Sequence, residues 1–267
     1  MRPAAASTGW TRPPLIANPW LRWWLYLGLL VYVIAAVSTL DVNWQRVVSG
    51  LANGWRILEG FLAPDFSTRA SDIWQGREES LTMTLTSTVV GCLISIPIGL
   101  GAARNISPLP VYAVCRAIIT VSRAFQEIIV AILFVAMFGF GPFAGFLTLS
   151  FATIGFMAKL LAEDIEDIKE VQAEAIRATG ANWWQVINYG IQPQVMPRLI
   201  GLSFYRLDIN FRESAVIGIV GAGGIGATLN TAMQRYDYDT AGAILIMIIV
   251  VVLAAVYLSS HLRKWVQ

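Results

Sequence analysis

Several stretches of this chain run for at least 18 residues without a charged side chain, and four of them are considered first. They cover residues 23–40, 80–103, 128–158 and 241–258. A helix needs about 20 mostly apolar residues to cross the hydrocarbon layer of a bilayer, so each run is long enough to span a membrane. Only 13% of the residues are charged, too few to cover the surface of a soluble globular domain. The pattern therefore excludes a soluble globule and a disordered chain, and it predicts an integral membrane protein.

The longest run, 128–158, exceeds the length of one span and is expected to break at the glycines and proline of residues 139–142. The helix before this break is predicted to begin near Val111, and the helix after it to end near Lys159. A further span is predicted at about 199–220, although that stretch carries four charged side chains. The expected fold is all-α, a polytopic membrane protein with about six transmembrane helices.

The chain is expected to have three regions. Residues 1–19 contain four prolines and are predicted to form a loose cytoplasmic tail. Residues 20–78 should hold the first transmembrane helix and an external interfacial segment, in which 47–61 is weakly amphipathic. Residues 79–267 should form the core of the protein, with cytoplasmic helices at about 163–192.

The distribution of basic residues predicts the orientation of the spans. Six spans put both termini on one side of the membrane. With the termini inside, ten Lys and Arg side chains of the tails and loops face the cytoplasm and five face outward. Cytoplasmic loops of membrane proteins carry an excess of Lys and Arg, so both termini are predicted to be cytoplasmic.

The segment 159–198, between the fourth and fifth predicted spans, is too long and too regular for a simple connection. Its apolar residues follow three- and four-residue steps, which predicts an amphipathic helix. This stripe comprises Ile165, Ile168, Val171, Ala175 and Thr179. Gly180 is expected to stop the helix, and Asn182 to cap a second short helix through a capping box with Gln185. Pro193 is expected to end that second helix.

The same segment resembles the Glu-Ala-Ala coupling loop of ABC importer permeases. Four positions match that motif in spacing, namely Glu174, Ala175, Gly180 and Pro193. The chain departs from it at Ile176, where the motif has a second alanine. Three longer stretches look like permeases of the phosphonate-uptake type, at 138–168, 174–200 and 211–229. The resemblance extends over about 79–262.

The resemblance implies a type I ABC importer permease fold in a bacterial inner membrane. It implies a pore of two permease copies, two cytoplasmic ATPase subunits and an extracytoplasmic solute-binding protein. The cargo would be a phosphonate, phosphite or hypophosphite, moved by alternating access. ATP and magnesium would bind the ATPase, so this chain would hold no cofactor. Contact with the ATPase is assigned by the resemblance to Glu174, Ala175, Gly180, Ala181, Asn182, Trp183 and Pro193.

Seven ionisable side chains fall inside the predicted spans, where charges are costly unless they face protein or water. They are Arg116, Arg123, Glu127, Arg206, Asp208, Arg212 and Glu213. Two pairs are spaced four residues apart, Arg123 with Glu127 and Asp208 with Arg212, so each pair could neutralise itself. The alternative is a translocation pathway whose excess of Arg suits an oxyanion, with Arg212 and then Arg123 as the leading candidates. The sequence leaves both interpretations open.

A run of glycines formally matches the G-x-G-x-x-G fingerprint of dinucleotide sites. It comprises Gly221, Gly223, Gly224 and Gly226. A dinucleotide site needs a surrounding βαβ unit, whereas here a short polar stretch and another uncharged span follow. The run is expected to form an extracellular turn where small residues let helices approach closely near an outer gate. A merely flexible turn is the alternative.

Other site chemistries find little support. One histidine and two cysteines make a metal site improbable, and the chain has no phosphate-cradling lysine loop. A near-neutral charge of +2 argues against a nucleic-acid binder. Enzymatic activity is therefore not expected. The rival hypotheses are a related importer for another solute, such as methionine or an organic cation, and a membrane-embedded enzyme without an ATPase partner.

Overall fold

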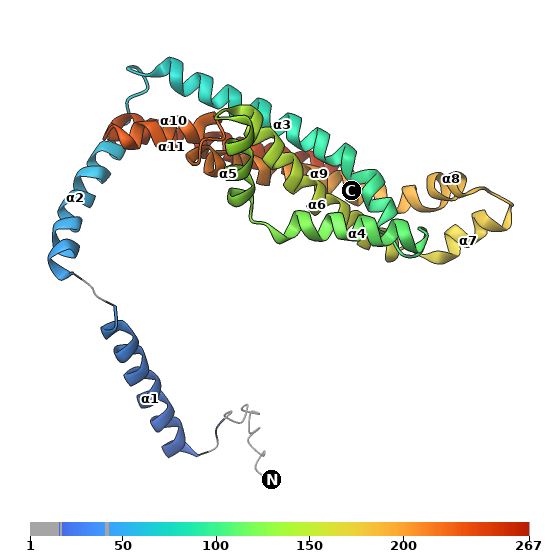
Figure 1. The fold of residues 1–267 in the computed structure, drawn as a ribbon, viewed down its shortest axis with the longest axis horizontal. Coiled ribbons are helices and arrows are strands. Elements are labelled where there is room, and N and C mark those ends of the chain that lie inside the picture. Colours follow the sequence, from blue (N-terminus) through green and yellow to red (C-terminus); the bar gives the residue numbers. More distant parts are fainter. Residues whose placement is uncertain (1–15, 17, 41–42, 267) are drawn as a thin grey trace, which may run out of the picture. The chain divides into compact units, whose positions relative to one another are not determined.

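A computed structural model of the chain describes residues 16, 18–40 and 43–266 (Figure 1). Every regular element in these ranges is helical, which confirms the all-α prediction. The elements are α1 (Pro19–Ser38), α2 (Trp44–Leu62), α3 (Ala70–Gly101), α4 (Leu109–Ala124), α5 (Glu127–Phe138), α6 (Pro142–Glu166), α7 (Glu170–Ala178), α8 (Trp183–Gln185), the π-helical η1 (Val186–Ile191), α9 (Gln192–Ile219), α10 (Gly224–Gln234) and α11 (Tyr238–Val266). The proposed tail of residues 1–19 lies almost entirely outside the described residues.

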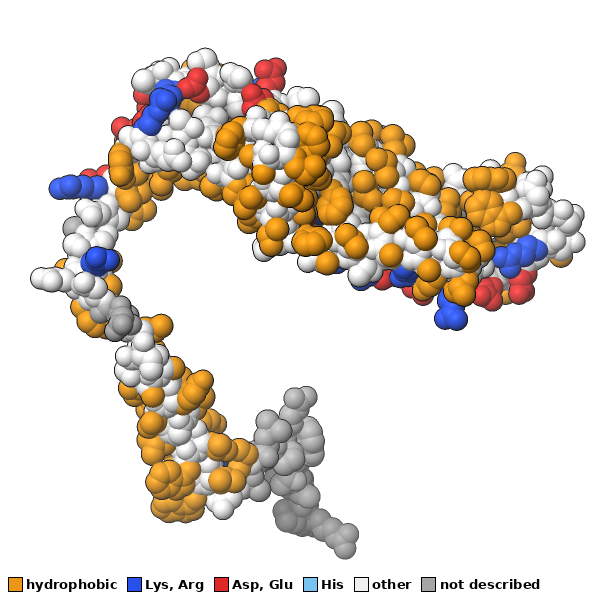
Figure 2. All heavy atoms as spheres, viewed as in Figure 1, with side chains coloured by type: hydrophobic (Ala, Val, Ile, Leu, Met, Phe, Trp, Pro, Cys, Tyr) orange, Lys and Arg blue, Asp and Glu red, His pale blue; other side chains and the backbone are white. Residues whose placement is uncertain are grey.

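The chain divides into two compact units, Met1–Trp55 and Arg56–Gln267. In the first unit, Asn18 caps α1 by accepting a hydrogen bond from the Trp20 backbone at 3.1 Å. Apart from Arg22 and Ser38, the side chains of α1 are mostly apolar, and most are exposed, as expected for a helix that faces lipid. In the second unit, hydrophobic side chains cover the middle and charged ones gather toward its two ends (Figure 2).

Small residues set the core of the second unit, where α3 packs along α6 more extensively than any other two described helices do. A Cβ placed on Gly91 would lie 2.6 Å from the Cβ of Thr153, and one on Gly99 would lie 2.8 Å from Leu161. These distances are far below van der Waals contact, so only glycine permits this approach. Close packing of small residues is a main source of helix association in lipid.

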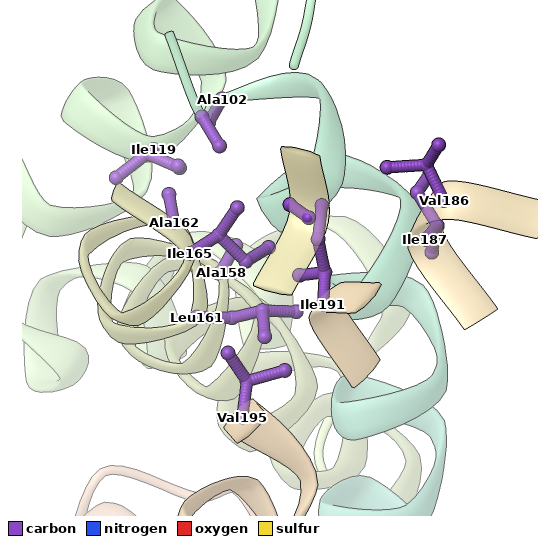
Figure 3. Packing of buried hydrophobic residues seen from close by; sticks show 12 residues of the cluster. Ala102, Ile119, Ala158, Leu161, Ala162, Ile165, Val186, Ile187, Ile191 and Val195 are labelled. Carbon is purple, nitrogen blue, oxygen red and sulfur yellow. The ribbon is translucent and has the colours of Figure 1, made fainter. Parts of the chain in front are cut away.

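A second apolar cluster fastens the segment 170–191, called here the α7–η1 hairpin, to the bundle (Figure 3). Figure 3 shows α6 side chains directed toward side chains of α4, η1 and α9. The labelled members on these elements include Ile119, Leu161, Ile165, Ile191 and Val195. Within the hairpin, α7 packs closely against η1, because a Cβ on Gly190 would lie 3.1 Å from the Cα of Ala173.

Five described helices are long and apolar enough to cross a membrane, or six when α4 and α5 count as one bent span. This agrees with the six predicted spans. The helix α5 ends at Phe138 and α6 begins at Pro142, so the break falls at the predicted residues 139–142. The continuous helix expected from Val111 is wrong, because α4 and α5 meet at 93°. Phe125 and Gln126 adopt extended backbone angles there, and neither is a glycine or proline that the sequence would mark as a breaker.

Two expectations for the segment after the fourth span are also wrong. The helix α6 continues past Lys159 to Glu166, so the proposed apolar stripe is split between two helices. Ile165 is fully buried on α6 whereas Val171 is 76% exposed on α7. Pro193 is the second residue of α9 and does not end a helix, because the first turn of an α-helix tolerates a proline.

The end of the bundle away from the α7–η1 hairpin contains a helix that the sequence pattern did not predict, the 11-residue α10 (Figure 1). The side chains of Glu79 and Ser80 on α3 cap its start. Glu79 Oε2 accepts from the Gly224 backbone N–H at 3.0 Å, and Ser80 Oγ accepts from that of Ile225 at 2.9 Å. The first N–H groups of a helix need such acceptors when they are buried, so α3 fixes where α10 begins.

The turn between α2 and α3 is held by Asp65. Its carboxylate accepts hydrogen bonds from the Ser67 hydroxyl at 2.6 Å, the Ser67 backbone at 2.8 Å and the side chain and backbone of Thr68. These donors hold the pKa of Asp65 well below its usual range. The Asp65 N–H donates to the carbonyl of Asp239 at 3.2 Å, which ties the turn to the start of α11.

Candidate functional site

Arg206 is the centre of the charged interior. It lies on α9 and is 3% exposed. Its Nη2 donates to Glu127 on α5 at 3.0 Å and to Glu213 on α9 at 3.3 Å. Its Nε donates to the hydroxyl of Thr153 on α6 at 3.1 Å. A buried charge in an apolar layer needs partners of this kind, and here they come from three helices.

The polar network continues one helical turn further along α9. Asn210 is fully buried, and its amide nitrogen donates to Thr88 on α3 at 2.8 Å and to Thr153 on α6 at 2.9 Å. Thr153 therefore joins Asn210 to Arg206. Hydrogen bonds between side chains thus link α3, α5, α6 and α9 at one level of the bundle.

A hollow of about 140 Å³ lies beside this network. Its lining comprises Ser122, Arg123, Phe125, Glu127, Ala152, Phe156 and Arg206. The guanidinium carbons of Arg123 and Arg206 lie 5.9 Å and 5.4 Å from the centre of the same ring, that of Phe156. The helix break at Phe125 lets residues of α4 and α5 contribute to one hollow.

The predicted pair of Arg123 with Glu127 is wrong, because the 93° bend interrupts the helix that would bring them together. Glu127 pairs with Arg206, and Arg123 takes part in none of the ion pairs of the described residues. Arg123 is exposed in the single chain and faces the hollow.

The other predicted pair is confirmed, with Arg212 Nη2 at 2.8 Å from Asp208 Oδ2. This pair points away from the Arg206 network, because a helix turns about 100° per residue and Asp208 follows Arg206 by two. The Arg212 side chain is 54% exposed. Arg116 lies elsewhere again, and its guanidinium contacts Glu166 at 2.8 Å and the Ala102 carbonyl at 2.9 Å. The seven predicted interior charges thus form three separate groups.

The α7–η1 hairpin carries the residues predicted to contact an ATPase. Gly180 has a φ of 81° and ends α7 as predicted. The capping box is confirmed, with Asn182 Oδ1 accepting from the Gln185 backbone at 2.9 Å and Gln185 Oε1 accepting from the Asn182 N–H at 2.8 Å. The indole of Trp183 donates to the Ile106 carbonyl at 3.0 Å, which ties the hairpin to the loop after α3.

Several side chains of the hairpin are exposed in the single chain. Glu174, Ala175 and Asn182 are exposed, and so are the large apolar side chains of Val171 and Trp184, at 76% and 63%. Val171 and Trp184 are thus large apolar side chains that the rest of the chain leaves uncovered.

The glycine run forms the turn between α9 and α10. Gly221, Gly223 and Gly224 have φ values of 97°, 77° and 73°, which favour glycine strongly. The Gly221 carbonyl accepts from the Gly141 N–H at 3.0 Å, and a Cβ on Gly223 would lie 2.5 Å from the Pro142 nitrogen. The turn after α9 therefore packs directly on the turn before α6.

The sequence analysis missed the neutral members of the polar network, Thr88, Thr153 and Asn210. Threonine and asparagine inside otherwise apolar spans are the signal that could have found them, because polar groups in lipid seek partners on other helices. A metal site finds no support in the described part of the chain, where no three His, Cys, Asp or Glu side chains cluster suitably.

Comparisons with known proteins agree with this architecture. Residues 95–267 match the family described as "Binding-protein-dependent transport system inner membrane component". The phosphite transport system permease protein PtxC of Stutzerimonas stutzeri is 35% identical over 252 residues, which cover 91% of this chain and 90% of that protein. The phosphate-import permease protein PhnE of Mycolicibacterium smegmatis is 38% identical over 239 residues, or 89% of this chain, which spans only 45% of that relative.

Solved structures share the fold. The permease chain in an inward-facing structure of the MetNI methionine ABC transporter is 24% identical, has a TM-score of 0.61, and is matched over 74% of this chain and 95% of its own. A chain of an amino acid ABC transporter crystallised with histidines is 20% identical with a TM-score of 0.62, over 75% and 98% of the two chains. The fold is thus that of a type I ABC importer permease. The chain belongs to the binding-protein-dependent transport system inner membrane component family and is a multi-pass membrane protein.

Proposed function

We propose that this chain is the pore-forming subunit of an ATP-driven importer for a phosphonate or a reduced phosphorus oxyanion such as phosphite or hypophosphite. The observation that supports the proposal most is similarity to a phosphite permease over nearly the full length of both chains. The interior chemistry is compatible with it, because Arg123 and Arg206 line the hollow against a single carboxylate, Glu127. Guanidinium groups match the geometry of phosphate-like anions.

The working transporter is proposed to contain two copies of this chain, two cytoplasmic ABC ATPase subunits and an extracytoplasmic solute-binding protein. ATP and magnesium bind the ATPase subunits, and this chain is not an enzyme. Both termini and the α7–η1 hairpin lie on the cytoplasmic side, and the turn at Gly221 faces outward. The excess of Lys and Arg on the proposed inner side supports this orientation.

Coupling to ATP hydrolysis is assigned to the α7–η1 hairpin. Its exposed apolar and charged side chains suit a groove on the ATPase, in the manner of a helix seated in a groove. The apolar cluster around Ile165 and Ile191 makes the hairpin move with α6 and α9. Movement of the ATPase would therefore alter the access of the pore from one side to the other.

The proposed translocation pathway uses the charged residues of α4, α5 and α9, namely Arg123, Glu127, Arg206, Asp208, Arg212 and Glu213. The glycine turn at residues 221–226 is proposed as part of the outer gate, since its packing on residues 141–142 has no room for side chains. Contacts with the cargo must stay weak, because a tightly bound ion would not leave the pore.

The test is uptake by the complete transporter in proteoliposomes, with the ATPase inside and the loaded binding protein outside. Radiolabelled phosphite and methylphosphonate should accumulate with ATP and not without it. Methionine and choline serve as competing cargoes for the alternative importer class. Uptake of either in place of the phosphorus anions would overturn the cargo assignment. Purification of the chain without any ATPase subunit would instead favour a membrane-embedded enzyme.

A further inference from the structure

We propose that the hollow between α4, α5, α6 and α9 is a transient binding site for a tetrahedral oxyanion, in which Arg123 holds the anion and Glu127 drives its release. This inference rests on the proposed transport function and assigns a specific site and roles within it. The sequence alone gives Arg212 priority over Arg123, and it leaves open whether Arg123 pairs with Glu127.

The two arginines that line the hollow differ in the number of carboxylates they contact. Arg206 has Glu127 at 3.0 Å and Glu213 at 3.3 Å, so two carboxylates share one guanidinium. Arg123 is in the same hollow and has no carboxylate partner among the residues described. The exposed guanidinium of Arg123 is therefore free to bind an anion that enters the hollow.

The size and lining of the hollow suit a small anion. Arg123 and Arg206 both lie near the Phe156 ring, at 5.9 Å and 5.4 Å, so two cations border one small space. The hollow measures about 140 Å³. A water molecule occupies roughly 30 Å³ in the liquid, so the space admits a small tetrahedral oxyanion together with water.

Glu127 is placed to favour release of the bound anion. Glu127 lines the same hollow and is the first residue of α5, immediately after the break at Phe125 and Gln126. The Glu127 carboxylate faces the position of the incoming anion and repels that anion. Arg206 keeps the carboxylate in place. Attraction by Arg123 and repulsion by Glu127 together give the weak, short-lived binding that conduction requires. Ser122 is not counted as a donor, because its hydroxyl donates to the Phe151 carbonyl at 2.7 Å.

The test compares Arg123→Gln, Arg123→Lys and Glu127→Gln in the complete transporter, with Arg235→Gln as control. Arg235 is exposed, lies outside the hollow, and its substitution removes the same charge. Two quantities are measured in proteoliposomes with radiolabelled phosphite, the initial uptake rate and the ATP hydrolysis stimulated by the loaded binding protein. Retention of phosphite by the washed, purified complex is measured separately.

Arg123→Gln should lower uptake about tenfold or more, the effect of losing one charge-assisted contact, while stimulated ATP hydrolysis stays within about twofold of wild type. Arg123→Lys should restore part of the uptake, because it keeps the charge without the planar fork. Glu127→Gln should retain more phosphite and slow turnover. The control should behave as wild type.

If the wild type takes up phosphite and the Arg123→Gln variant takes it up at the same rate, this inference is overturned and the proposed function still stands. An equal loss of uptake and ATP hydrolysis that Arg123→Lys does not relieve would assign Arg123 a structural role and also overturn it. Unchanged phosphite retention in Glu127→Gln would refute the release role. Failure of the wild type to move any phosphorus oxyanion would contradict the proposed function itself.

Discussion

Asn210 is the residue on which the interior network depends most clearly. It has no exposed surface, and one amide nitrogen serves two threonines on two other helices. Side-chain hydrogen bonds between helices in a membrane contribute modestly when taken singly, but loss of this amide leaves two buried hydroxyls with fewer partners. The residue acts on stability and on the position of Arg206, through the shared contact with Thr153.

Asn210→Leu should lower the free energy of unfolding by roughly 1–2 kcal/mol, since two interhelical hydrogen bonds are lost. The measurement is thermal unfolding of the detergent-purified chain. Thr86→Val is the matched control, because the Thr86 hydroxyl is bonded only within its own helix, to Thr82 and Met83. Equal melting temperatures for Asn210→Leu and the control would contradict this role.

At the scale of single elements, the turn at Gly180 determines the shape of the α7–η1 hairpin. Gly180→Val should reduce uptake strongly, because a β-branched residue at a φ of 81° is strained. Gly180→Asn should keep most of it, because asparagine tolerates this backbone conformation. A Cβ here meets nothing within 4 Å, so crowding cannot explain a difference between the two variants. Uptake in proteoliposomes and membrane insertion are measured together, and equal uptake by both variants would refute the interpretation.

Elements marked by strong local signals could be predicted from the sequence. The glycines and proline at 139–142, the stop at Gly180 and the Asn182 capping box all appear in the structure because each depends on residues close in the chain. The break at Phe125 was missed because no local residue type demands it. The helix α10 was missed because its cap comes from Glu79, which is 145 residues away.

In the candidate site, too, only contacts between residues close in the chain could be predicted. The four-residue spacing rule correctly paired Asp208 with Arg212, which lie on one unbroken helix. The rule failed for Arg123 because the helix does not continue to Glu127. The true partner of Glu127 is Arg206, 79 residues away, and only tertiary packing brings these side chains together. Partners on the same unbroken helix could be predicted from the sequence, whereas partners on other helices could not.

At the scale of the whole molecule, the proposed assembly makes a prediction about purification. The affinity-tagged chain should carry an ATPase subunit with it, and Glu174→Lys should lose that subunit while remaining in the membrane. Glu174 is exposed on α7, so the reversal of its charge alters an outer surface and not the core. The measurement is the amount of ATPase recovered per permease. Undiminished recovery from Glu174→Lys would contradict the assignment of the hairpin.

The helices α8, η1 and α9 follow one another without a loop, from Trp183 to Ile219. At 1.5 Å per residue, Trp183 and Arg206 are separated by roughly 35 Å along this shaft, about the thickness of the hydrocarbon layer. The hairpin and the buried guanidinium are therefore joined by continuous helix, with no intervening coil. The π-helical stretch Val186–Ile191 changes the register of the backbone hydrogen bonds within this shaft, and Pro197 removes one further backbone donor.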